Sequence, residues 1–328
     1  MKRGFIFLLA ICAGLLTTAG EAAGHKPTEI SVGYFLQRPT PAQFSQATQT
    51  FDNALGLKVN WVAFENGNEM NRALVQNRIQ IAFAQGHVPF LLGVSQGLEL
   101  SMIGIAVGYP DNDNCIISDE AGITHENFSS LEGRKVAVEV GSVSHYRLLK
   151  VLQHLGIDQS RVEIVDTEDA TAAASALQQG EVAMACASGG ALRALETLGK
   201  PLLGGVEQAA IGLPLFDTVI AANGFINEHS AIVQRFMDVV EASNEQWRKN
   251  PEPMRAAIAR AAQMGVEGAS RRLEAFRFPA AEEQKSDAWM GAVVPAYSKD
   301  LADFFVAQGQ LGKALENYDR FITTRFLR

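Results

Sequence analysis

Four short turns rich in glycine, serine and asparagine each follow a stretch of strand-forming residues. They are Asn66-Gly-Asn68, Gln85-Gly-His87, Gly141-Ser-Val-Ser144 and Ala187-Ser-Gly-Gly190. Each turn opens a helix, so its free N–H groups and the positive helix end can receive an anion. Ligands of open α/β sheets bind at the carboxyl ends of the strands. A single turn of this kind is an ordinary helix start, but four of them predict a ligand-binding cleft.

Sequence motifs for catalysis and metal binding are missing. The chain has no H-E-x-x-H, no G-x-S-x-G and no phosphate-binding loop, and its six histidines include no pair at metal-ligand spacing. His87 and His145 are therefore interpreted as structural residues or as hydrogen-bonding partners of a ligand. Residues 111–114 begin like a calcium loop but lack its later glycine and glutamate. We expect a protein that is not an enzyme, without a metal or a cofactor.

The segments that position the turns alternate between strands and helices. Strands are expected at residues 29–34, 58–64, 79–84 and 99–107, with helices at 43–55, from 68 to 77 and up to 96. The order repeats with strands at 114–118, 134–140, 162–165 and 182–186 and helices at 145–155 and 170–179. This alternation predicts βαβ units, parallel sheets and two similar α/β lobes. From about residue 227 the pattern is helical.

The N-terminus is typical of a secretory signal peptide. Lys2 and Arg3 precede an apolar run at residues 5–16, and small residues follow up to Ala23. The run is shorter than the roughly 20 residues needed to span a bilayer. We therefore expect residues 1–23 to be removed and the mature protein to reach the periplasm. A lipoprotein with Cys12 as the lipid acceptor is the less favoured alternative.

Charge and cysteine content narrow the remaining function classes. Without Lys2, Arg3 and Glu21, the 28 basic and 36 acidic residues become 26 and 35, a net charge of −9. Such a surface argues against nucleic acid or an anionic membrane as a partner. Of the three cysteines, Cys12 leaves with the signal peptide. Cys115 and Cys186 are interpreted as two buried free thiols; a bridge between them is the open alternative, which their spacing does not support.

Several motifs resemble the taurine-binding proteins of bacterial ABC importers and, more broadly, the sulfonate/nitrate/taurine group of periplasmic binding proteins. They include Gly133-Arg-Lys-Val-Ala-Val138, Ser144-His-Tyr146, Leu155-Gly-Ile157 and the tail at residues 318–326. The resemblance implies a type II periplasmic binding protein fold, with two α/β lobes joined by two crossing strands. Lobe 1 would contain residues 24–109 and 220–328, and lobe 2 would be an insertion of residues 110–219.

The same resemblance implies how the residues of the cleft act. Asp217 stands in the Pro-x-x-Asp position of the family, where it would hold the ammonium group of the ligand; alternatively it is an exposed hinge residue that caps a turn. Ser142 and Ser144 fall in a hydroxyl-bearing turn that would suit an acidic group. The complete predicted ligand-binding set is Asn68, Glu69, Gln85, Gly86, His87, Asp113, Asn114, Ser142, Ser144, His145, Ser188 and Asp217.

Three departures from the family pattern concern the ligand. The aromatic stretch that walls the family's pocket is replaced by residues 185–190, which would enlarge the cavity. Glu69 adds a carboxylate, and the family's acidic residue before the strand at Cys115 appears as Asp113-Asn114. An added carboxylate repels a sulfonate and favours a further cationic group. The expected ligand is thus taurine or a related, larger amine-containing or zwitterionic solute.

The sequence therefore favours an extracytoplasmic solute-binding protein that captures its ligand by lobe closure. Its partners would be this small solute and the permease subunits of an ABC importer, and we expect a monomer. A ligand-presenting sensor or chemoreceptor partner of the same fold is the alternative. An enzyme of this fold, such as a pyrimidine-precursor or deaminase-like protein, is less favoured.

Overall fold

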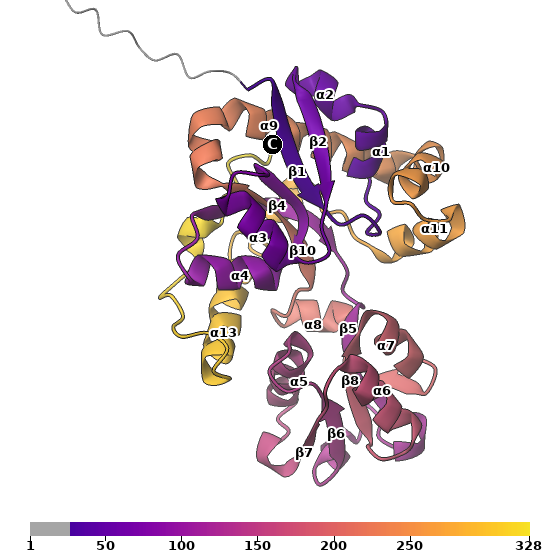
Figure 1. Cartoon of the computed structure of the whole chain (residues 1–328). Helices are drawn as coiled ribbons and strands as arrows, with labels where there is room; N and C mark the ends of the chain where they lie inside the picture. Colours follow the sequence, from indigo (N-terminus) through magenta and orange to yellow (C-terminus); the bar gives the residue numbers. More distant parts are fainter. Residues whose placement is uncertain (1–26) are drawn as a thin grey trace, which may run out of the picture.

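Two five-stranded sheets organise the chain into an upper and a lower lobe (Figure 1). The computed structural model describes residues 27–328. The predicted signal peptide and Cys12 lie outside these described residues. Both expectations about the N-terminus therefore stay predictions.

The first sheet has the strand order β2-β1-β3-β10-β4. Its strands are β1 (Glu29–Tyr34), β2 (Lys58–Ala63), β3 (Ile81–Gly86), β4 (Leu100–Gly108) and β10 (Phe216–Ala222). The helices of this lobe are α1 (Ala42–Ala47), α2 (Thr50–Leu55), α3 (Gly67–Val75), α4 (His87–Ser95), α9 (Asn223–Lys249), α10 (Glu252–Ala261), α11 (Val266–Ala275), α12 (Ala281–Lys285) and α13 (Val293–Ala307).

The second sheet has the order β7-β6-β8-β5-β9. Its strands are β5 (Asp113–Ser118), β6 (Lys135–Val138), β7 (Glu163–Asp166), β8 (Met184–Ser188) and β9 (Gly199–Pro201). The helices of this lobe are α5 (Val143–His154), α6 (Ala170–Gln178), α7 (Gly189–Leu195) and α8 (Gly205–Ala210). The two lobes thus repeat one strand–helix plan, as the sequence predicts, and the α/β fold is confirmed.

Both sheets are mixed, which corrects the expectation of parallel sheets. β10 runs antiparallel to β3 and β4, and β5 runs antiparallel to β8 and β9. The remaining pairs are parallel, as βαβ units require. The antiparallel strands are those next to the connections between the lobes. A chain that leaves a sheet for the other lobe and later returns is free to reverse its direction.

The chain crosses between the lobes twice, after β4 and before β10. β10 pairs with the first sheet along its whole length, starting from Phe216 opposite Gly108. The predicted boundary between residues 219 and 220 therefore falls inside a strand of the first sheet. The register also places Asp217 opposite Gly86 of β3 and Val107 of β4, at the end of the sheet that faces the second lobe.

One predicted helix is interrupted. The sequence predicts a continuous helix over residues 43–55, but the structure has α1 and α2 with Gln49 between them in the left-handed region, at φ 55°. Thr48 caps α1 and Thr50 opens α2, and their hydroxyl oxygens are 2.8 Å apart. Side chains of this type compete for local hydrogen bonds and so favour helix ends over helix interiors.

Cys115 and Cys186 form a disulfide, so the expectation of free thiols is wrong. The two residues are directly opposite each other in the antiparallel pair of β5 and β8. Both side chains are almost completely buried. Sequence spacing did not indicate the bond because the two cysteines are 71 positions apart, and the chain between them includes β6, β7, α5 and α6.

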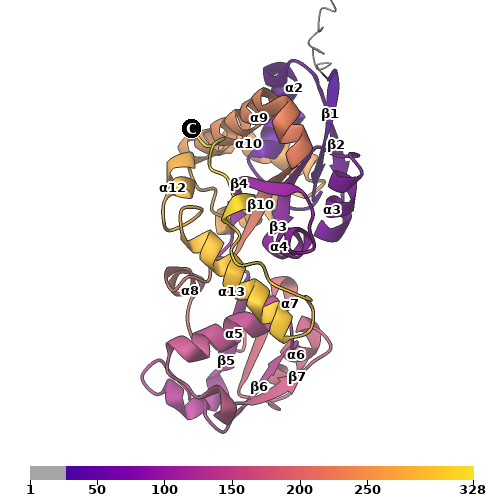
Figure 2. The ribbon, with the colours of Figure 1, turned by 90° about the vertical axis from the view of Figure 1, so that its left-hand side faces the viewer.

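Helix α13 connects the lobes outside the two crossings (Figure 2). It belongs to the C-terminal segment of the first lobe, yet it packs along α5 of the second. Tyr146 of α5 contacts Tyr297 and Phe304 of α13 with ring centroids 5.9 and 5.4 Å apart. Lys150 adds an ion pair with Asp300 at 2.8 Å. An aromatic contact and an ion pair thus join the lobes in addition to the crossing segments.

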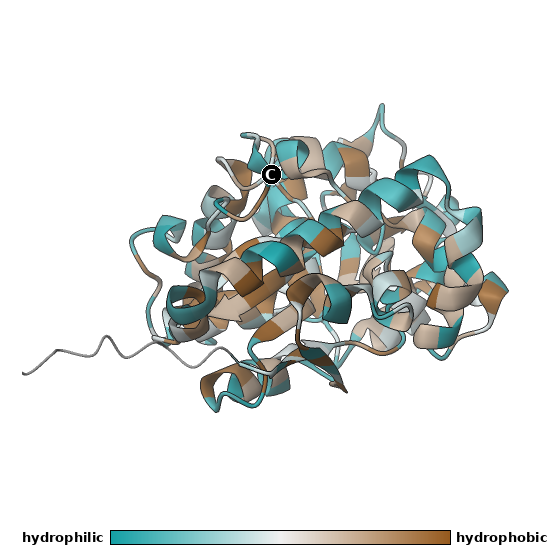
Figure 3. Ribbon diagram, turned by 90° about the horizontal axis from the view of Figure 1, so that it is seen from above, coloured by the Kyte–Doolittle hydropathy of each residue, from teal (hydrophilic) through white to brown (hydrophobic). Residues whose placement is uncertain are grey.

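Apolar residues concentrate on the strands and on the inward faces of the helices, while the outer helix faces are hydrophilic (Figure 3). In β1, for example, Ile30 and Val32 are buried and Glu29 is exposed. None of the helices within residues 27–328 has the length and apolarity needed to span a membrane.

Candidate functional site

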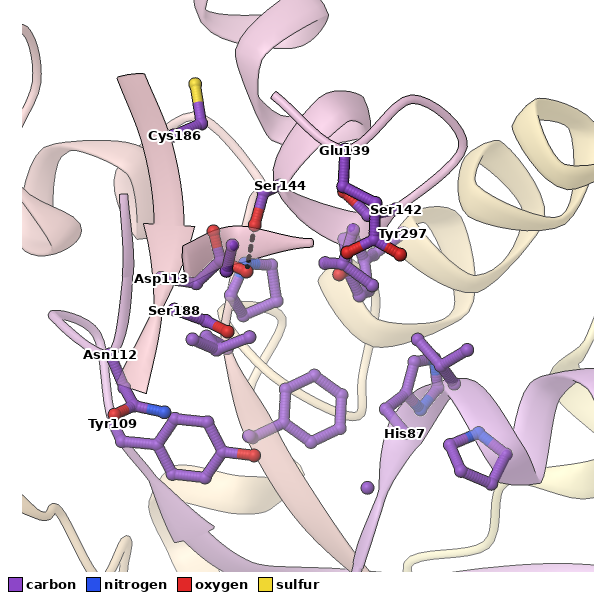
Figure 4. Close-up of a pocket in the computed structure, with 18 residues that line it drawn as sticks. His87, Tyr109, Asn112, Asp113, Glu139, Ser142, Ser144, Cys186, Ser188 and Tyr297 are labelled. Carbon is purple, nitrogen blue, oxygen red and sulfur yellow. Dashed lines mark hydrogen bonds between the residues drawn. The ribbon is translucent and has the colours of Figure 1, made fainter. Parts of the chain in front are cut away.

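A pocket of about 330 Å³ lies between the two lobes (Figure 4). The first lobe lines it with the start of α4, the crossing after β4, the residues before β10 and one side chain of α13. The second lobe adds the starts of β5, α5 and α6 and the end of β8. The lining residues are Gly86, His87, Val88, Pro89, Tyr109, Asn112, Asp113, Glu139, Ser142, Val143, Ser144, Ala170, Cys186, Ser188, Pro214, Leu215, Phe216 and Tyr297.

Asp113 is the buried acid of this pocket, at the first position of β5. Its Oδ2 accepts a hydrogen bond from the Ser144 hydroxyl at 2.9 Å, while its Oδ1 has no hydrogen-bond partner among residues 27–328. The Nε of the buried Arg147 is 3.9 Å from Oδ1, an ion pair without a hydrogen bond. Burial raises the pKa of the Asp113 carboxyl, and Arg147 and Ser144 offset part of this rise. Oδ1 is thus a buried acceptor without a hydrogen-bond donor, and Arg147 is the cation beside it.

The turn before α5 supplies a second acid and a hydroxyl. Ser142 caps the helix: its side-chain oxygen accepts from the backbone N–H of His145 at 3.1 Å. The hydroxyl proton of Ser142 stays available to a ligand. Glu139 is exposed beside it, and Figure 4 shows the two side chains next to each other. Across the pocket, Ser188 ends β8 and presents a further hydroxyl.

His87 forms part of the wall on the side of the first lobe. Burial lowers the pKa of its imidazole to about 3, so the ring is neutral at physiological pH. Its Nε2 lies 2.9 Å from the Ser298 hydroxyl oxygen. Because this hydroxyl donates to the Val294 carbonyl at 2.7 Å, it accepts from the Nε2–H of His87. Nδ1 is then a hydrogen-bond acceptor, and it has no partner in the described part of the chain.

A second compartment of about 660 Å³ adjoins the first and shares Gly86, Pro89 and Tyr109 with it. It extends into the first lobe between the ends of β1, β2 and β3. Its lining residues are Phe35, Leu36, Gln37, Arg38, Ala63, Phe64, Glu65, Asn66, Gly67, Gly86, Pro89, Tyr109, Asp217 and Arg272. The two compartments therefore form one cleft with two chemically different ends.

Asp217 lies in the second compartment, and both of its carboxylate oxygens already have partners. The Tyr109 hydroxyl donates to Oδ1 at 2.5 Å, and the Arg38 guanidinium donates to Oδ2. Burial raises the pKa of Asp217, while Arg38 and Tyr109 lower it. Burial alone would lower the pKa of Arg38, but the Asp217 carboxylate raises it above its usual value, so the guanidinium stays charged. Asp217 is thus neither exposed nor a turn cap.

Most of the predicted site residues meet in this cleft. Gly86, His87, Asp113, Ser142, Ser144 and Ser188 line the first compartment, and Asp217 lines the second together with Gly86. The other five predicted residues line neither compartment: Asn68, Glu69, Gln85, Asn114 and His145. Ligand contact by any of the twelve residues stays a prediction.

Three of these five make structural contacts within their own lobe. The Gln85 amide donates to the Gly67 carbonyl at 3.1 Å and to Asn71 at 2.7 Å. Asn114 donates to the Leu203 carbonyl at 3.0 Å and accepts from Gln208 at 2.7 Å. The Nδ1 of His145 accepts from the backbone N–H of Gly141 at 3.1 Å. These contacts position the turns that border the cleft.

Asn68 and Glu69 lie in the first turn of α3. Asn68 is exposed, and Glu69 is about 40% exposed with its carboxylate 3.9 Å from Arg72, one turn further along the helix. A surface pair of this kind contributes little to stability.

Sequence reasoning missed Arg38, Tyr109, Glu139 and Tyr297. Tyr109 and Glu139 follow β4 and β6 directly, so their places at strand ends were a usable signal. Arg38 lies further from its strand, in the loop that follows β1. Tyr297 gave no such signal, because it lies inside α13 and not at the end of a strand.

Comparison of the chain with known proteins shows the family to which it belongs. The pattern of the NMT1/THI5-like family matches residues 49–254, which include both crossings and most of the lining residues. The chain belongs to the NMT1/THI5-like family. It is similar to the taurine-binding periplasmic protein of Escherichia coli strain K12, with 28% identity over 296 residues, 88% of this chain and 89% of that protein.

Solved structures of this family's fold include binding proteins and an enzyme. The periplasmic aliphatic sulphonate binding protein SsuA from Escherichia coli matches with a TM-score of 0.66 and 21% identity, over 90% of this chain and 96% of that chain. The desulfurization enzyme DSZB matches with a TM-score of 0.60 and 15% identity, over 90% and 97%. The type II periplasmic binding protein fold is thus confirmed.

Proposed function

We propose that this protein is the extracytoplasmic solute-binding component of an ABC importer and captures taurine or a related, larger amine-containing solute between its lobes. The similarity to a taurine-binding periplasmic protein supports solute capture and a periplasmic location. The first compartment supports a ligand that contains an amine. Its wall contains two carboxylates and, among its 18 lining residues, no lysine or arginine.

Asp113 carries the argument for an ammonium group. The buried Oδ1 of Asp113, which lacks a donor, and the exposed Glu139 carboxylate can both accept hydrogen bonds, and a charged donor gives the stronger bond. An ammonium group would also provide the donor that the buried Oδ1 lacks. The hydroxyl oxygens of Ser142 and Ser188 can accept the remaining protons.

Lobe closure follows from how the lining is divided. His87 and Tyr297 belong to the first lobe, whereas Asp113 and Ser142 belong to the second. A ligand that contacts both groups stabilises the closed form over the open form. The permease would recognise that closed form. Presentation to a membrane receptor would use the same capture step, so a neighbouring gene pair for an ATPase and a permease would favour import.

Among the described residues, the first compartment offers no free thiol and no serine paired with a histidine. Both cysteines of the described chain are in the disulfide. The one serine that contacts His87, Ser298, is fully buried, and it is not part of the lining. A neutral imidazole with a pKa of about 3 is a weak general base at physiological pH. These observations favour binding without turnover.

A thermal-shift panel tests the proposed function. Taurine and 3-aminopropanesulfonate should raise the unfolding temperature, because a ligand at a hundred times its Kd adds about 2.7 kcal/mol of stability. Ethanesulfonate, which lacks the amine, should raise it much less. The proposal would be wrong if no amine-containing solute in the panel stabilised the protein.

A further inference from the structure

We propose that Arg38 binds an acidic group of the solute in the second compartment and that Asp217 is the positioning residue that holds Arg38 in place. This inference rests on the proposed function, because it assigns the other end of the same ligand. It gives Asp217 a role different from the direct ammonium binding that the sequence predicts.

Asp217 already has partners within the protein for its negative charge. The carboxylate is completely buried, and its two oxygens are engaged by Tyr109 and Arg38. A buried carboxylate needs a cation, and in this chain Arg38 is that cation. A ligand ammonium could reach Asp217 only by displacing one of these two partners. The position that an ammonium would occupy is therefore taken by a residue of the protein itself.

The Arg38 side chain is accessible from the cleft and has hydrogen-bond donors to spare. It is 37% exposed and lines the second compartment, so it is accessible from the cleft. Its guanidinium lies over the Phe35 ring at 4.6 Å. Only one of its nitrogens donates a hydrogen bond within residues 27–328. Guanidinium carries five N–H donors in a planar fork, which leaves donors for a second anion. Because Asp217 and Phe35 fix its orientation, little side-chain entropy is lost on binding.

The walls around Arg38 indicate what the acidic group is attached to. Phe35, Phe64 and Pro89 provide apolar surface, and Tyr109 separates this compartment from the first. Two exposed charges of opposite sign, Glu65 and Arg272, also line the compartment, together with the polar Gln37 and Asn66. The three apolar side chains can contact an aliphatic or aromatic body beside these polar groups.

The two compartments differ in charge: the first is acidic, whereas in the second Arg38 and Arg272 balance Asp217 and Glu65. Asp113 and Glu139 make the first compartment acidic, and Arg38 provides an oriented cation in the second. We therefore assign the ligand class as an amino acid or amino-sulfonate in the chemical sense: an ammonium group, an apolar body and a terminal sulfonate or carboxylate. The two compartments together offer more room than a two-carbon body such as that of taurine requires.

A matched pair of probes tests the acidic group. 4-(2-Aminoethyl)benzenesulfonate and 4-(2-aminoethyl)benzenesulfonamide share the protonated amine and the aromatic body. They differ at the other end, where the sulfonate carries a negative charge and the sulfonamide is neutral. Titration calorimetry should show that the wild-type protein binds the sulfonate about 10- to 100-fold more tightly, since hydrogen bonds to charged groups have that worth. Equal affinity for the two probes, or binding of neither, would overturn the inference.

Variants then assign the effect to Arg38. Arg38→Gln should remove the preference for the sulfonate, and Arg38→Lys should keep part of it. Because Arg38→Gln leaves Asp217 without its cation, the double variant Arg38→Gln/Asp217→Asn removes both charges and should also bind the two probes equally. Arg271→Gln is the control: it changes net charge equally on α11, at an exposed residue outside the lining, and should keep the wild-type preference.

Asp217→Asn separates the two roles of the carboxylate. If Asp217 positions Arg38, the variant should lose part of the sulfonate preference and keep its affinity for the sulfonamide. Loss of affinity for both probes would show that Asp217 holds the ammonium itself, and the inference would fail. Failure of the proposed function looks different, because the wild-type protein would then ignore taurine and 3-aminopropanesulfonate as well.

Discussion

Asp113 is the residue whose substitution should most affect amine binding. Asp113→Asn keeps an oxygen that can accept from Ser144 but removes the charge, so affinity for 3-aminopropanesulfonate should fall about 10- to 100-fold. Calorimetric titration measures this loss. Asp119→Asn, which removes an exposed carboxylate just after β5, should bind normally. Unchanged affinity of the Asp113 variant would remove the support for an ammonium group in the first compartment.

The same substitution should reduce the stability of the ligand-free protein. Arg147 is fully buried, and Asp113 is the one acidic side chain that forms an ion pair with it in the described part of the chain. Removing one partner of a buried pair leaves an uncompensated charge, which costs about 3–5 kcal/mol in well-paired cases. The separation of 3.9 Å places this pair at the lower end of that range. Denaturant unfolding of both forms measures the difference.

His87 should make stability depend on pH. Its pKa is about 3 in the folded protein because of burial, and about 6.5 in the unfolded chain. Between these values the unfolded chain binds more protons, so the free energy of unfolding falls as the pH decreases. From pH 6.5 to 4.5 the loss should be about 2–3 kcal/mol. His87→Gln should flatten this slope, whereas His125→Gln, at an exposed position, should not. Equal slopes in all three proteins would contradict the assignment.

The disulfide joins the two strands of the second lobe that border the cleft. Cys115 and Cys186 lie opposite each other in β5 and β8, and Cys186 lines the first compartment. Replacing both with alanine should lower the free energy of unfolding by about 2–4 kcal/mol, because the cross-link restricts the unfolded chain. Denaturant unfolding with and without reductant checks this value. The reductant should destabilise the wild-type protein and leave the double variant unchanged.

The disulfide also shows why the sequence predicts single strands and helices better than it predicts which strands pair with each other. The strand containing Cys115 and the strand containing Cys186 were both expected, but their pairing depends on β5 reversing direction beside β8. Alternation of strands and helices contains no information about that reversal. The break at Gln49 was missed for a related reason: the apolar spacing of residues 43–55 continues through a left-handed residue.

The sequence predicted those residues of the candidate site whose position depends only on a local turn. Ser142, Ser188 and His87 lie at strand ends or helix starts, and a single stretch of sequence places them there. Arg38 and Asp217 are 179 residues apart, and their pairing depends on β1, β3 and β10 lying together in one sheet. The sequence alone does not reveal this arrangement of strands, so it predicted Asp217 as an unpaired acid that a ligand could contact.

For the whole molecule, ligand binding should change the relative position of the lobes. The lining of the cleft is divided between them, and α13 already packs across their boundary through Tyr297. Small-angle X-ray scattering should therefore show a smaller radius of gyration when saturating 3-aminopropanesulfonate is added. Asp113→Asn at the same concentration serves as the control and should not contract. An unchanged radius for the saturated wild-type protein would argue against capture by closure.

Capture of an intact amine-containing solute is tested most directly by titration calorimetry combined with recovery of the ligand. The wild-type protein should bind 3-aminopropanesulfonate or a longer amino-sulfonate in a 1:1 ratio, and chromatography after denaturation should return the solute chemically unchanged. Saturable binding that is lost in Asp113→Asn is the result we predict. Conversion of the solute during incubation, or no binding of any amine-containing sulfonate, would contradict it.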